Sequence, residues 1–220
     1  MPAEASGAAP TPAGRPIDPR VAASVTASWG RIDRWLAENA RPLLDKMGKP
    51  ATAAAISAAE AALGVDLPDD VRASYAVHDG SDAVGLFPSG DYLSLDGMLH
   101  QYQVWKRLVG EGAFAGRVSE PRGPIRPVHY DLRWVPLTHN GGGDHTLIDL
   151  APADGGKVGQ LIDFSHETGP EGVAADSLAE YLSRLADALE AGAGECVHDE
   201  FIDWPSDEPL SRSAFPNPKK

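Results

Sequence analysis

Cysteine and long apolar runs are nearly absent from this chain of 220 residues. Cys196 is its only cysteine, so an intrachain disulfide bond and a metal site built from several thiolates are both excluded. No run of about 18 apolar residues occurs, so we expect no membrane-spanning helix. The first residues lack a basic stretch followed by an apolar one, which is the pattern of a secretory signal. A cytoplasmic location is therefore the expectation.

Positive charge is also scarce. The chain has 19 lysines and arginines against 32 aspartates and glutamates, which gives a formal charge of −13. Direct binding to nucleic acid or to an anionic membrane through non-specific charge is therefore not expected. The same excess would attract a basic protein partner, although solubility explains it equally well.

Recognisable catalytic motifs are missing too. The chain has no G-x-S-x-G sequence, no Walker sequence and no Cys–His pairing. His139, Asp144 and His145 surround a glycine-rich turn and could hold a metal ion. No fourth ligand is indicated, however, and the spacing matches no known metal motif. We therefore favour a glycine-rich turn with surface histidines, and we expect neither a metal nor a cofactor.

Two further pairs of polar residues, His78 with Asp79 and Asp149 with Asp163, are explained better by structural roles than by catalytic ones. His78 and Asp79 could form half of an acid–base pair, but no partner is indicated. A histidine near a helix C-terminus, followed by an aspartate that fixes the turn, is the simpler interpretation. Asp149 and Asp163 alternate with apolar neighbours, so we expect them on a solvated sheet face.

The segment 133–164 predicts the centre of the fold. Trp134–Leu137, His145–Leu150 and Val158–Phe164 are short apolar runs separated by two glycine-rich turns. Such runs, bounded by Asn, Asp and Gly, are typical of an antiparallel meander. Val173–Ala175 is a candidate for one further short strand.

Helical patterns flank this meander on both sides. Apolar spacing predicts a helix that begins near Asp18-Pro19, an alanine-rich helix over 51–63 that stops at Gly64, and a helix that opens at Leu67-Pro68 and ends at 78–80. Asp96 is the predicted cap of the next helix. The last helix begins at Ser177, where Glu180 completes a capping-box pattern.

The remaining segments complete the domain plan. Residues 85–87 and 92–95 predict a hairpin, and residues 110–127 predict a long loop. We expect a disordered tail over 1–20, one α+β domain over 21–192, and an acidic, proline-containing tail over 193–220. Phe201, Ile202 and Trp204 are the tail residues able to dock on the domain. The predicted architecture is a mixed, mainly antiparallel sheet flanked by helices on one side.

An ordered series of short motifs resembles the Smi/Knr-type cell-wall assembly regulators of the SUKH superfamily, over about residues 25 to 190. The motifs are Trp29-x2-Ile32-x2-Trp35-Leu36, Ile56-x3-Glu60-x2-Leu63-Gly64-x2-Leu67-Pro68, Tyr75-x2-His78-Asp79-Gly80, Leu86-Phe87, Tyr92-Leu93-x-Leu95, Trp134-x-Pro136-Leu137, Gly142-Gly143-Asp144, Asp149-Leu150, Gly159-Gln160-Leu161-Ile162, Ala174 and Ser177-Leu178-x2-Tyr181-Leu182.

The resemblance implies a SUKH-like fold and a non-catalytic role in protein binding. Bacterial members are implied to be immunity proteins that neutralise toxins, and fungal members to be regulators that coordinate wall glucan synthesis with signalling. The family's characteristic polar positions would fall on Glu60, Asp79, Gly80, Asp144 and Gln160, in binding or in fold maintenance.

Composition and small size favour a bacterial chain, so the leading hypothesis is an immunity-type protein that binds a basic toxin domain. A regulatory scaffold for cell-wall or envelope synthesis, or for another cytosolic enzyme, is the alternative. An enzyme centred on His139, Asp144 and His145, acting on a small molecule or through a metal, is the third. Residues 110–127 and the C-terminal tail depart from the family pattern, and such variable loops would carry partner specificity.

Overall fold

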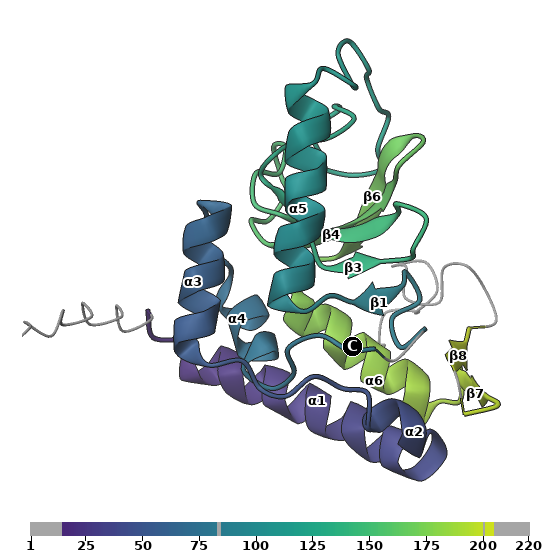
Figure 1. Cartoon of the computed structure of the whole chain (residues 1–220). Coiled ribbons are helices and arrows are strands. Elements are labelled where there is room, and N and C mark those ends of the chain that lie inside the picture. Colours follow the sequence, from purple (N-terminus) through teal and green to yellow (C-terminus); the bar gives the residue numbers. More distant parts are fainter. Residues whose placement is uncertain (1–14, 83–84, 200, 205–220) are drawn as a thin grey trace, which may run out of the picture.

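The computed structural model describes residues 15–82, 85–199 and 201–204, with helices mainly in its first half and strands mainly in its second (Figure 1). The elements in chain order are α1 (Pro19–Asn39), α2 (Arg41–Leu44), α3 (Ala53–Leu63), α4 (Asp69–Tyr75), β1 (Asp91–Tyr92), α5 (Leu95–Gly110), β2 (Trp134–Pro136), β3 (Thr138–His139), β4 (His145–Asp149), β5 (Gln160–Ser165), β6 (Gly169–Ala175), α6 (Leu178–Glu190), β7 (Glu195–Val197) and β8 (Phe201–Asp203). The α+β class expected from the sequence is confirmed.

A four-stranded antiparallel sheet of order β2-β4-β5-β6 forms the centre of the fold. The predicted meander is therefore confirmed, and its last strand is longer than expected, because β6 begins at Gly169. The register aligns Val135, Ile148 and Leu161 across β2, β4 and β5. Side chains alternate between the two faces of a strand, so this row faces one side and the rows next to it face the other.

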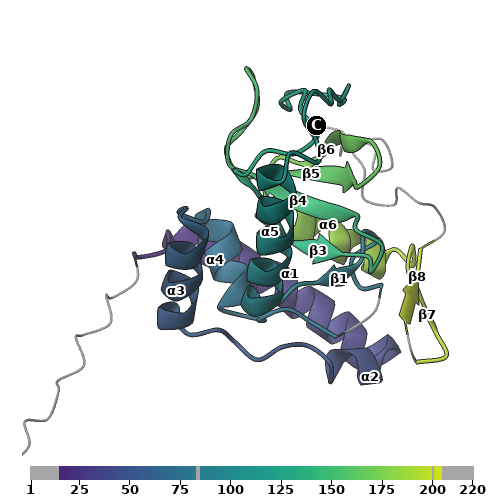
Figure 2. The ribbon, with the colours of Figure 1, turned by 45° about the horizontal axis from the view of Figure 1, so that its top comes forward.

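The face that carries Val135, Ile148 and Leu161 packs on helices. These three side chains are fully buried in the larger apolar cluster, together with Trp29 of α1 and Leu182 of α6. Helices α1 and α6 lie side by side along this side of the sheet (Figures 1 and 2). This layer holds the larger of the two apolar clusters, so we expect it to supply most of the hydrophobic stabilisation.

The opposite face of the sheet is covered as well. Leu147 and Ile162 pack there in a second apolar cluster with Trp105, which comes from α5. Ile125 and Tyr130 join this cluster from the segment between α5 and β2. The long loop predicted over 110–127 therefore contributes to a cover for the second face, and the sheet has no broad solvated side.

Local signals place the ends of several helices correctly. The Asp18 carboxylate accepts a hydrogen bond from the Arg20 amide at 2.7 Å and caps α1. Gly64 ends α3 with φ +73°, a left-handed conformation that glycine adopts without steric cost. The Ser177 hydroxyl caps α6 through the Glu180 amide at 3.1 Å. None of the helices in the described ranges has the length and apolarity that crossing a membrane requires.

Two predicted helix boundaries are wrong. Helix α4 ends at Tyr75 rather than at 78–80. Gly80 does have a positive φ of +74°, but it lies in the turn beyond the helix. Helix α5 is capped by Ser94, whose hydroxyl accepts the Gly97 amide at 3.1 Å, and not by Asp96. Ser94 has the extended backbone that an N-cap needs, whereas Asp96 already lies in the first helical turn.

The hairpin predicted between residues 85–87 and 92–95 is also wrong. Phe87 and Gly90 form only an isolated bridge. Tyr92 in β1 instead pairs with Thr138 in β3. Glycine at position 90 lets the turn before β1 approach β3 closely, because a Cβ at this position would lie 2.5 Å from the backbone carbonyl carbon of His139.

The C-terminal part of the described chain forms the small antiparallel hairpin β7–β8. Ile202 is buried in the larger apolar cluster. The indole Nε1 of Trp204 donates to the carbonyl of Gly85 at 2.7 Å. The rest of the two predicted tails, residues 1–14 and 205–220, lies outside the described residues.

Candidate functional site

An acidic pocket lies beside the segment Asp79–Asp82. It has a volume of about 370 Å³ and lies between residues 46–48, 79–82 and 91–97. Three carboxylates, those of Asp79, Asp82 and Asp91, line it against a single lysine, Lys46. Asp79, which lines this pocket, is one of the five residues that the family resemblance identified. Gly80, the next residue in the chain, is another.

The carboxylates of the acidic pocket differ in their surroundings. Asp79 Oδ1 accepts a hydrogen bond from the Leu95 amide at 2.7 Å, which ties it to the start of α5. Asp82 is exposed. Burial raises the pKa of Asp91, and the like charge of Asp82 raises it further, against a smaller opposing effect of His139. The pocket therefore concentrates negative charge that a cationic group would stabilise.

Close backbone contacts hold the wall of the acidic pocket in place. At Gly80, with φ +74°, a Cβ would lie 2.3 Å from the Ser94 backbone nitrogen. At Gly48 a Cβ would lie 2.2 Å from the carbonyl oxygen of Asp79. Neither position can carry a side chain without moving the backbone, which is a structural reason for glycine at position 80.

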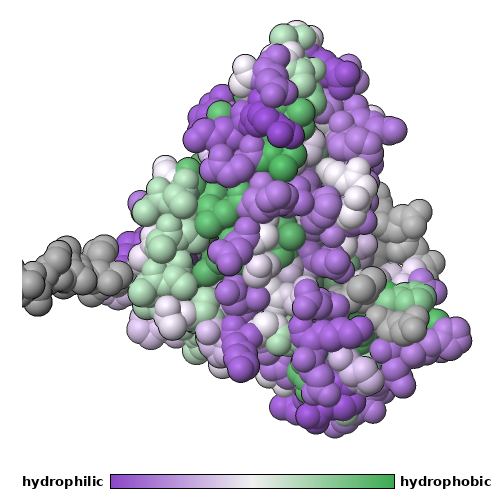
Figure 3. Space-filling view, in the orientation of Figure 1, coloured by the Kyte–Doolittle hydropathy of each residue, from purple (hydrophilic) through white to green (hydrophobic). Residues whose placement is uncertain are grey.

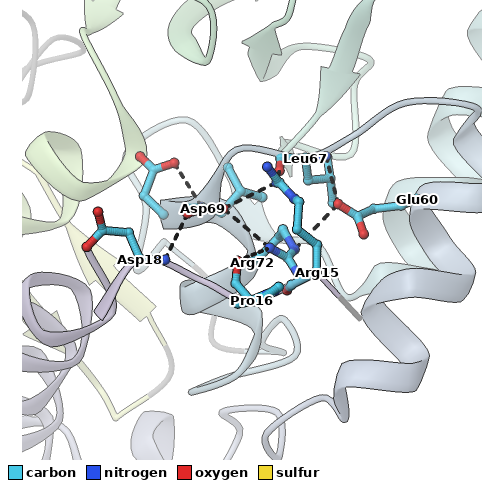
Figure 4. Close-up of polar contacts among 9 residues, drawn as sticks. Arg15, Pro16, Asp18, Glu60, Leu67, Asp69 and Arg72 are labelled. Atoms are coloured by element: carbon cyan, nitrogen blue, oxygen red, sulfur yellow. Dashed lines mark hydrogen bonds and ion pairs between the residues drawn. The ribbon is translucent and has the colours of Figure 1, made fainter. Parts of the chain in front are cut away.

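Glu60 lies elsewhere, at the junction of α3 and α4 (Figure 4). Its Oε1 accepts the Leu67 amide at 2.9 Å and lies 3.5 Å from Nε of Arg72. Arg72 is only 3% exposed, and its Nη1 lies 3.3 Å from the Asp69 carboxylate. Glu60 therefore ties the loop before α4 to α3 and faces a buried arginine.

The outer face of α3 is apolar but flat. Its exposed side chains include Ala54, Ala58 and Ala61. Figure 3 shows this helix as a pale green area beside a surface that is mostly hydrophilic. Alanine methyl groups offer little area each, so the surface lacks the large side chains that dominate protein interfaces.

Asp144 organises the turn between β3 and β4. Its Oδ1 accepts the backbone amide of His166 at 3.0 Å and His166 Nδ1 at 2.8 Å. Its Oδ2 accepts from Asn140 Nδ2 at 2.7 Å. Burial alone would raise the pKa of Asp144, but these hydrogen bonds outweigh it and the pKa is lowered. The carboxylate is thus held charged between two turns.

Gln160 belongs to a buried network at the end of the sheet. Its Nε2 donates to Asp149 Oδ2 at 2.9 Å and to the carbonyl of Pro124 at 3.1 Å. Asp149 is fully buried and also accepts from Trp134 Nε1 at 3.0 Å. The expectation of a solvated Asp149 is wrong, because its side of the sheet is covered. Burial raises the pKa of Asp149, against the opposing effect of its hydrogen bonds.

The cluster of His139, Asp144 and His145 does not have the arrangement of a metal site. His145 is only 2% exposed, which corrects the expectation of a surface histidine. Its Nδ1 bonds the Thr138 carbonyl at 2.6 Å, and its Nε2 lies 3.0 Å from Trp105 Nε1. Both ring nitrogens are therefore occupied. Residues 15–82, 85–199 and 201–204 contain no group of three or more His, Cys, Asp or Glu side chains placed to hold a metal ion.

His78 is paired with a residue other than Asp79. Its Nε2 lies 3.0 Å from Asp33 Oδ1 on α1, and its Nδ1 lies 3.0 Å from the carbonyl oxygen of Gly48. Burial would lower the pKa of His78, but these contacts outweigh it and the pKa is raised. The ring also meets Trp29 edge to face. The carboxylate of Asp79 points instead to Leu95, so an acid–base pair of His78 with Asp79 is not formed.

The five residues that the resemblance identified belong to separate places. Asp79 and Gly80 lie at the acidic pocket, whereas Glu60, Asp144 and Gln160 are each held in a different network. Sequence reasoning missed Asp82 and Asp91 as pocket residues and Arg72 as the buried arginine. No local sequence pattern predicts that residues 46–48, 79–82 and 91–97 come together, so Asp82 and Asp91 could not be identified as pocket residues from the sequence.

Comparison with known proteins gives a consistent family. The family model of the SMI1 / KNR4 family (SUKH-1) matches residues 50–184. A "KNR4/SMI1 homolog" of Yarrowia lipolytica is 31% identical over 235 residues, which cover 83% of this chain and 33% of the relative. The "Cell wall biosynthesis/cell cycle regulator smi1" of Schizosaccharomyces pombe is 32% identical over 185 residues, which cover 76% and 36%. The "Cell wall assembly regulator SMI1" of Saccharomyces cerevisiae is 28% identical over 210 residues, which cover 78% and 42%.

All three relatives are fungal, and those of Schizosaccharomyces pombe and Saccharomyces cerevisiae are named as regulators. They do not support the bacterial, immunity-type member that composition favoured. The chain spans only 33% to 42% of the length of these three curated relatives. The family match covers more than half of the chain, and it includes the central sheet and the acidic pocket apart from Lys46 and Gly48. The chain therefore belongs to the SMI1/KNR4 family (SUKH-1).

Proposed function

We propose that this chain is a non-catalytic regulatory module that acts on cell-wall assembly by binding a protein partner. The observation that carries the proposal is its similarity, over 76% to 78% of the chain, to proteins named as regulators of cell-wall biosynthesis and assembly. This is the scaffold role that the sequence left as an alternative. We further propose that the module works in the cytoplasm, where its single cysteine would stay reduced.

The acidic pocket is the surface that we assign to partner contact. Its volume of about 370 Å³ suits one inserted side chain, and its lining holds three aspartates against one lysine. A lysine or arginine from the partner would relieve the repulsion between Asp82 and Asp91. The overall charge of −13 would speed the approach of such a partner without adding much to the final affinity.

The hydrogen bonds of the polar residues support a binding role over a catalytic one. A catalytic acid or base needs a free proton-transfer site near a substrate position. Asp79 is tied to the Leu95 amide, and both nitrogens of His145 are occupied. Neither group is therefore placed for general acid–base work, in keeping with relatives that are named as regulators.

Toxin neutralisation is the competing function, and the net negative charge supports it equally well. The two functions differ in the partner. A regulator would bind enzymes or signalling proteins of wall synthesis, whereas an immunity protein would bind a toxin domain and abolish its activity.

Affinity capture followed by quantitative mass spectrometry tests the proposal. The wild-type chain is compared with Asp82→Lys, which reverses the charge of the acidic pocket, and with Asp154→Lys, an equal change at an exposed turn away from the pocket. We expect proteins of wall-polysaccharide synthesis to be enriched by the wild type and by Asp154→Lys, and to fall about tenfold with Asp82→Lys, since a lost charge pair at an interface costs on the order of 1.4 kcal/mol or more.

One result would contradict the regulatory role, and another would contradict only the assignment of the acidic pocket to it. Recovery of a toxin domain whose activity is blocked by a molar excess of the chain would favour the competing function. Equal recovery of wall-synthesis proteins by wild type and Asp82→Lys would leave the regulatory role intact but would remove the acidic pocket from it.

A further inference from the structure

The junction of α3 and α4 binds a short extended segment of the chain itself. Residues 15–18 run along the start of α4, before α1 begins (Figure 4). Arg72 Nη2 donates to the carbonyl of Arg15, and Arg72 Nη1 approaches the carbonyl of Pro16 at 3.5 Å. The Asp18 amide donates to Asp69 Oδ2 at 2.9 Å. The backbone of this segment is thus contacted through two carbonyls and one amide.

One side chain of the segment is recognised as well. The guanidinium of Arg15 donates through Nη2 to the carbonyl of Leu67 at 2.9 Å, and the same nitrogen lies 3.2 Å from Asp69 Oδ1. We call Leu67, Asp69 and Arg72 the α4 clamp. A carboxylate and a carbonyl that converge on one guanidinium, beside groups that bond a peptide backbone, are the elements of a peptide-binding site.

The clamp needs an occupant, because Arg72 is poorly satisfied by its own neighbours. Arg72 is 3% exposed, yet the carboxylates of Asp69 and Glu60 lie 3.3 and 3.5 Å from its guanidinium nitrogens. Charge-assisted hydrogen bonds are normally shorter, about 2.7–2.9 Å. Arg72 also donates to the carbonyl of Arg15. Loss of the segment would therefore deprive this guanidinium of a hydrogen-bond acceptor.

We propose that the α4 clamp is a docking site for an extended, arginine-bearing segment of a partner protein, and that residues 15–18 of this chain fill it in the free state. Ile17 of the segment is partly buried against the larger apolar cluster, whereas the contacts between the segment and the clamp are polar, and the Arg15 side chain is 53% exposed. Such contacts exchange easily with equivalent ones from another chain. The clamp shares no residue with the acidic pocket, so the two proposals stand or fall separately.

Occupation of the clamp by residues 15–18 lowers the apparent affinity of a partner for the clamp. A tethered segment competes at a high effective concentration, so a free peptide of the same sequence binds only the fraction of molecules whose clamp is open. A partner therefore gains access either by making further contacts elsewhere or by engaging residues 15–18. Weakening the internal segment should make the clamp available to a free peptide.

Fluorescence anisotropy with a labelled, amidated peptide that has the sequence of residues 13–18 tests the proposal on the full chain. The hosts are the wild type, Arg15→Ala, and the control Arg20→Ala, whose side chain is also exposed and lies on α1. Arg15→Ala removes one exposed ion pair and one hydrogen bond from the internal segment. We expect the peptide to bind Arg15→Ala about tenfold more tightly than it binds the wild type or Arg20→Ala, a change of about 1.4 kcal/mol.

A second comparison tests which group recognises the peptide. In the Arg15→Ala host, a peptide with alanine in place of its arginine should bind at least about fivefold more weakly, and adding Asp69→Asn should abolish this difference. Asp69→Asn keeps the size of the side chain and an acceptor for the backbone amide, so the fold is retained. The proposal is overturned if no binding is detected at about 1 mM peptide, if all three hosts bind alike, or if the alanine peptide binds equally well.

Discussion

Acidification should destabilise the protein through His145, whose ring is buried and neutral. Burial lowers its pKa from 6.5 to about 4. A protonated ring would carry a hydrogen on Nε2, so it could no longer accept the Trp105 indole N–H, 3.0 Å away. A histidine whose folded pKa lies below its unfolded pKa stabilises the fold above pH 6.5, and this stability is lost as the pH falls toward 4.

The magnitude follows from the size of the pKa change. One pKa unit corresponds to about 1.36 kcal/mol, so a decrease to about 4 amounts to about 3 kcal/mol in total. At pH 5 the unfolded chain would carry a protonated His145 and the folded chain a neutral one. About 2 kcal/mol should therefore be lost between pH 7 and pH 5. The raised pKa of His78 acts in the opposite sense over this range.

Urea unfolding followed by tryptophan fluorescence at pH 7 and pH 5 measures this effect. We expect His145→Gln, which does not titrate, to lose about 2 kcal/mol less than the wild type between the two pH values. His100→Gln, a matched change at an exposed position on α5, should keep the wild-type dependence. Contributions from His78 cancel in the comparison. If His145→Gln and the wild type lose the same stability, the assignment of a buried neutral ring is wrong.

Two further substitutions test the close contacts of the fold. Gly80→Ala should lower the free energy of unfolding by more than about 3 kcal/mol, and Gly64→Ala should lower it by about 1 kcal/mol. Both glycines have φ near +74°, but only at Gly80 would a Cβ meet the backbone, 2.3 Å from the Ser94 nitrogen. Equal losses in urea unfolding would contradict this reasoning. Asp149→Ala should cost about 3 kcal/mol, because it leaves the buried Trp134 indole N–H without its acceptor; a loss below about 1 kcal/mol would show that the network adds little.

Local patterns predicted the secondary structure well where partners are close in the chain. The central meander joins strands through short glycine-rich turns, so apolar runs and turn residues were sufficient to predict it. The pairing of Tyr92 with Thr138 was missed, because the partner strand is distant in sequence. Residues 87–90 do form a tight turn, but turn chemistry alone does not identify which strand receives the following residues.

The candidate site was harder to predict than the fold. The family resemblance pointed to Asp79 and Gly80, but neither periodicity nor spacing brings Asp82 and Asp91 to the same pocket. Asp149 was misplaced because alternation in a strand was interpreted as one buried face and one wet face. That rule fails when a long connection covers the second face, and Ile125 and Tyr130 provide such a cover here. Burial of a polar residue therefore depended on a segment without regular structure.

The presence of an apolar cluster on each face of one sheet has a consequence for how the protein unfolds. Alternate residues of the same strands, such as Leu147 and Ile148, supply the two clusters. Neither cluster can lose its strand residues without removing the support of the other. Trp29 reports on one cluster, and Trp105 reports on the other. We therefore expect a single cooperative transition, in which the fluorescence of both tryptophans changes at the same urea concentration.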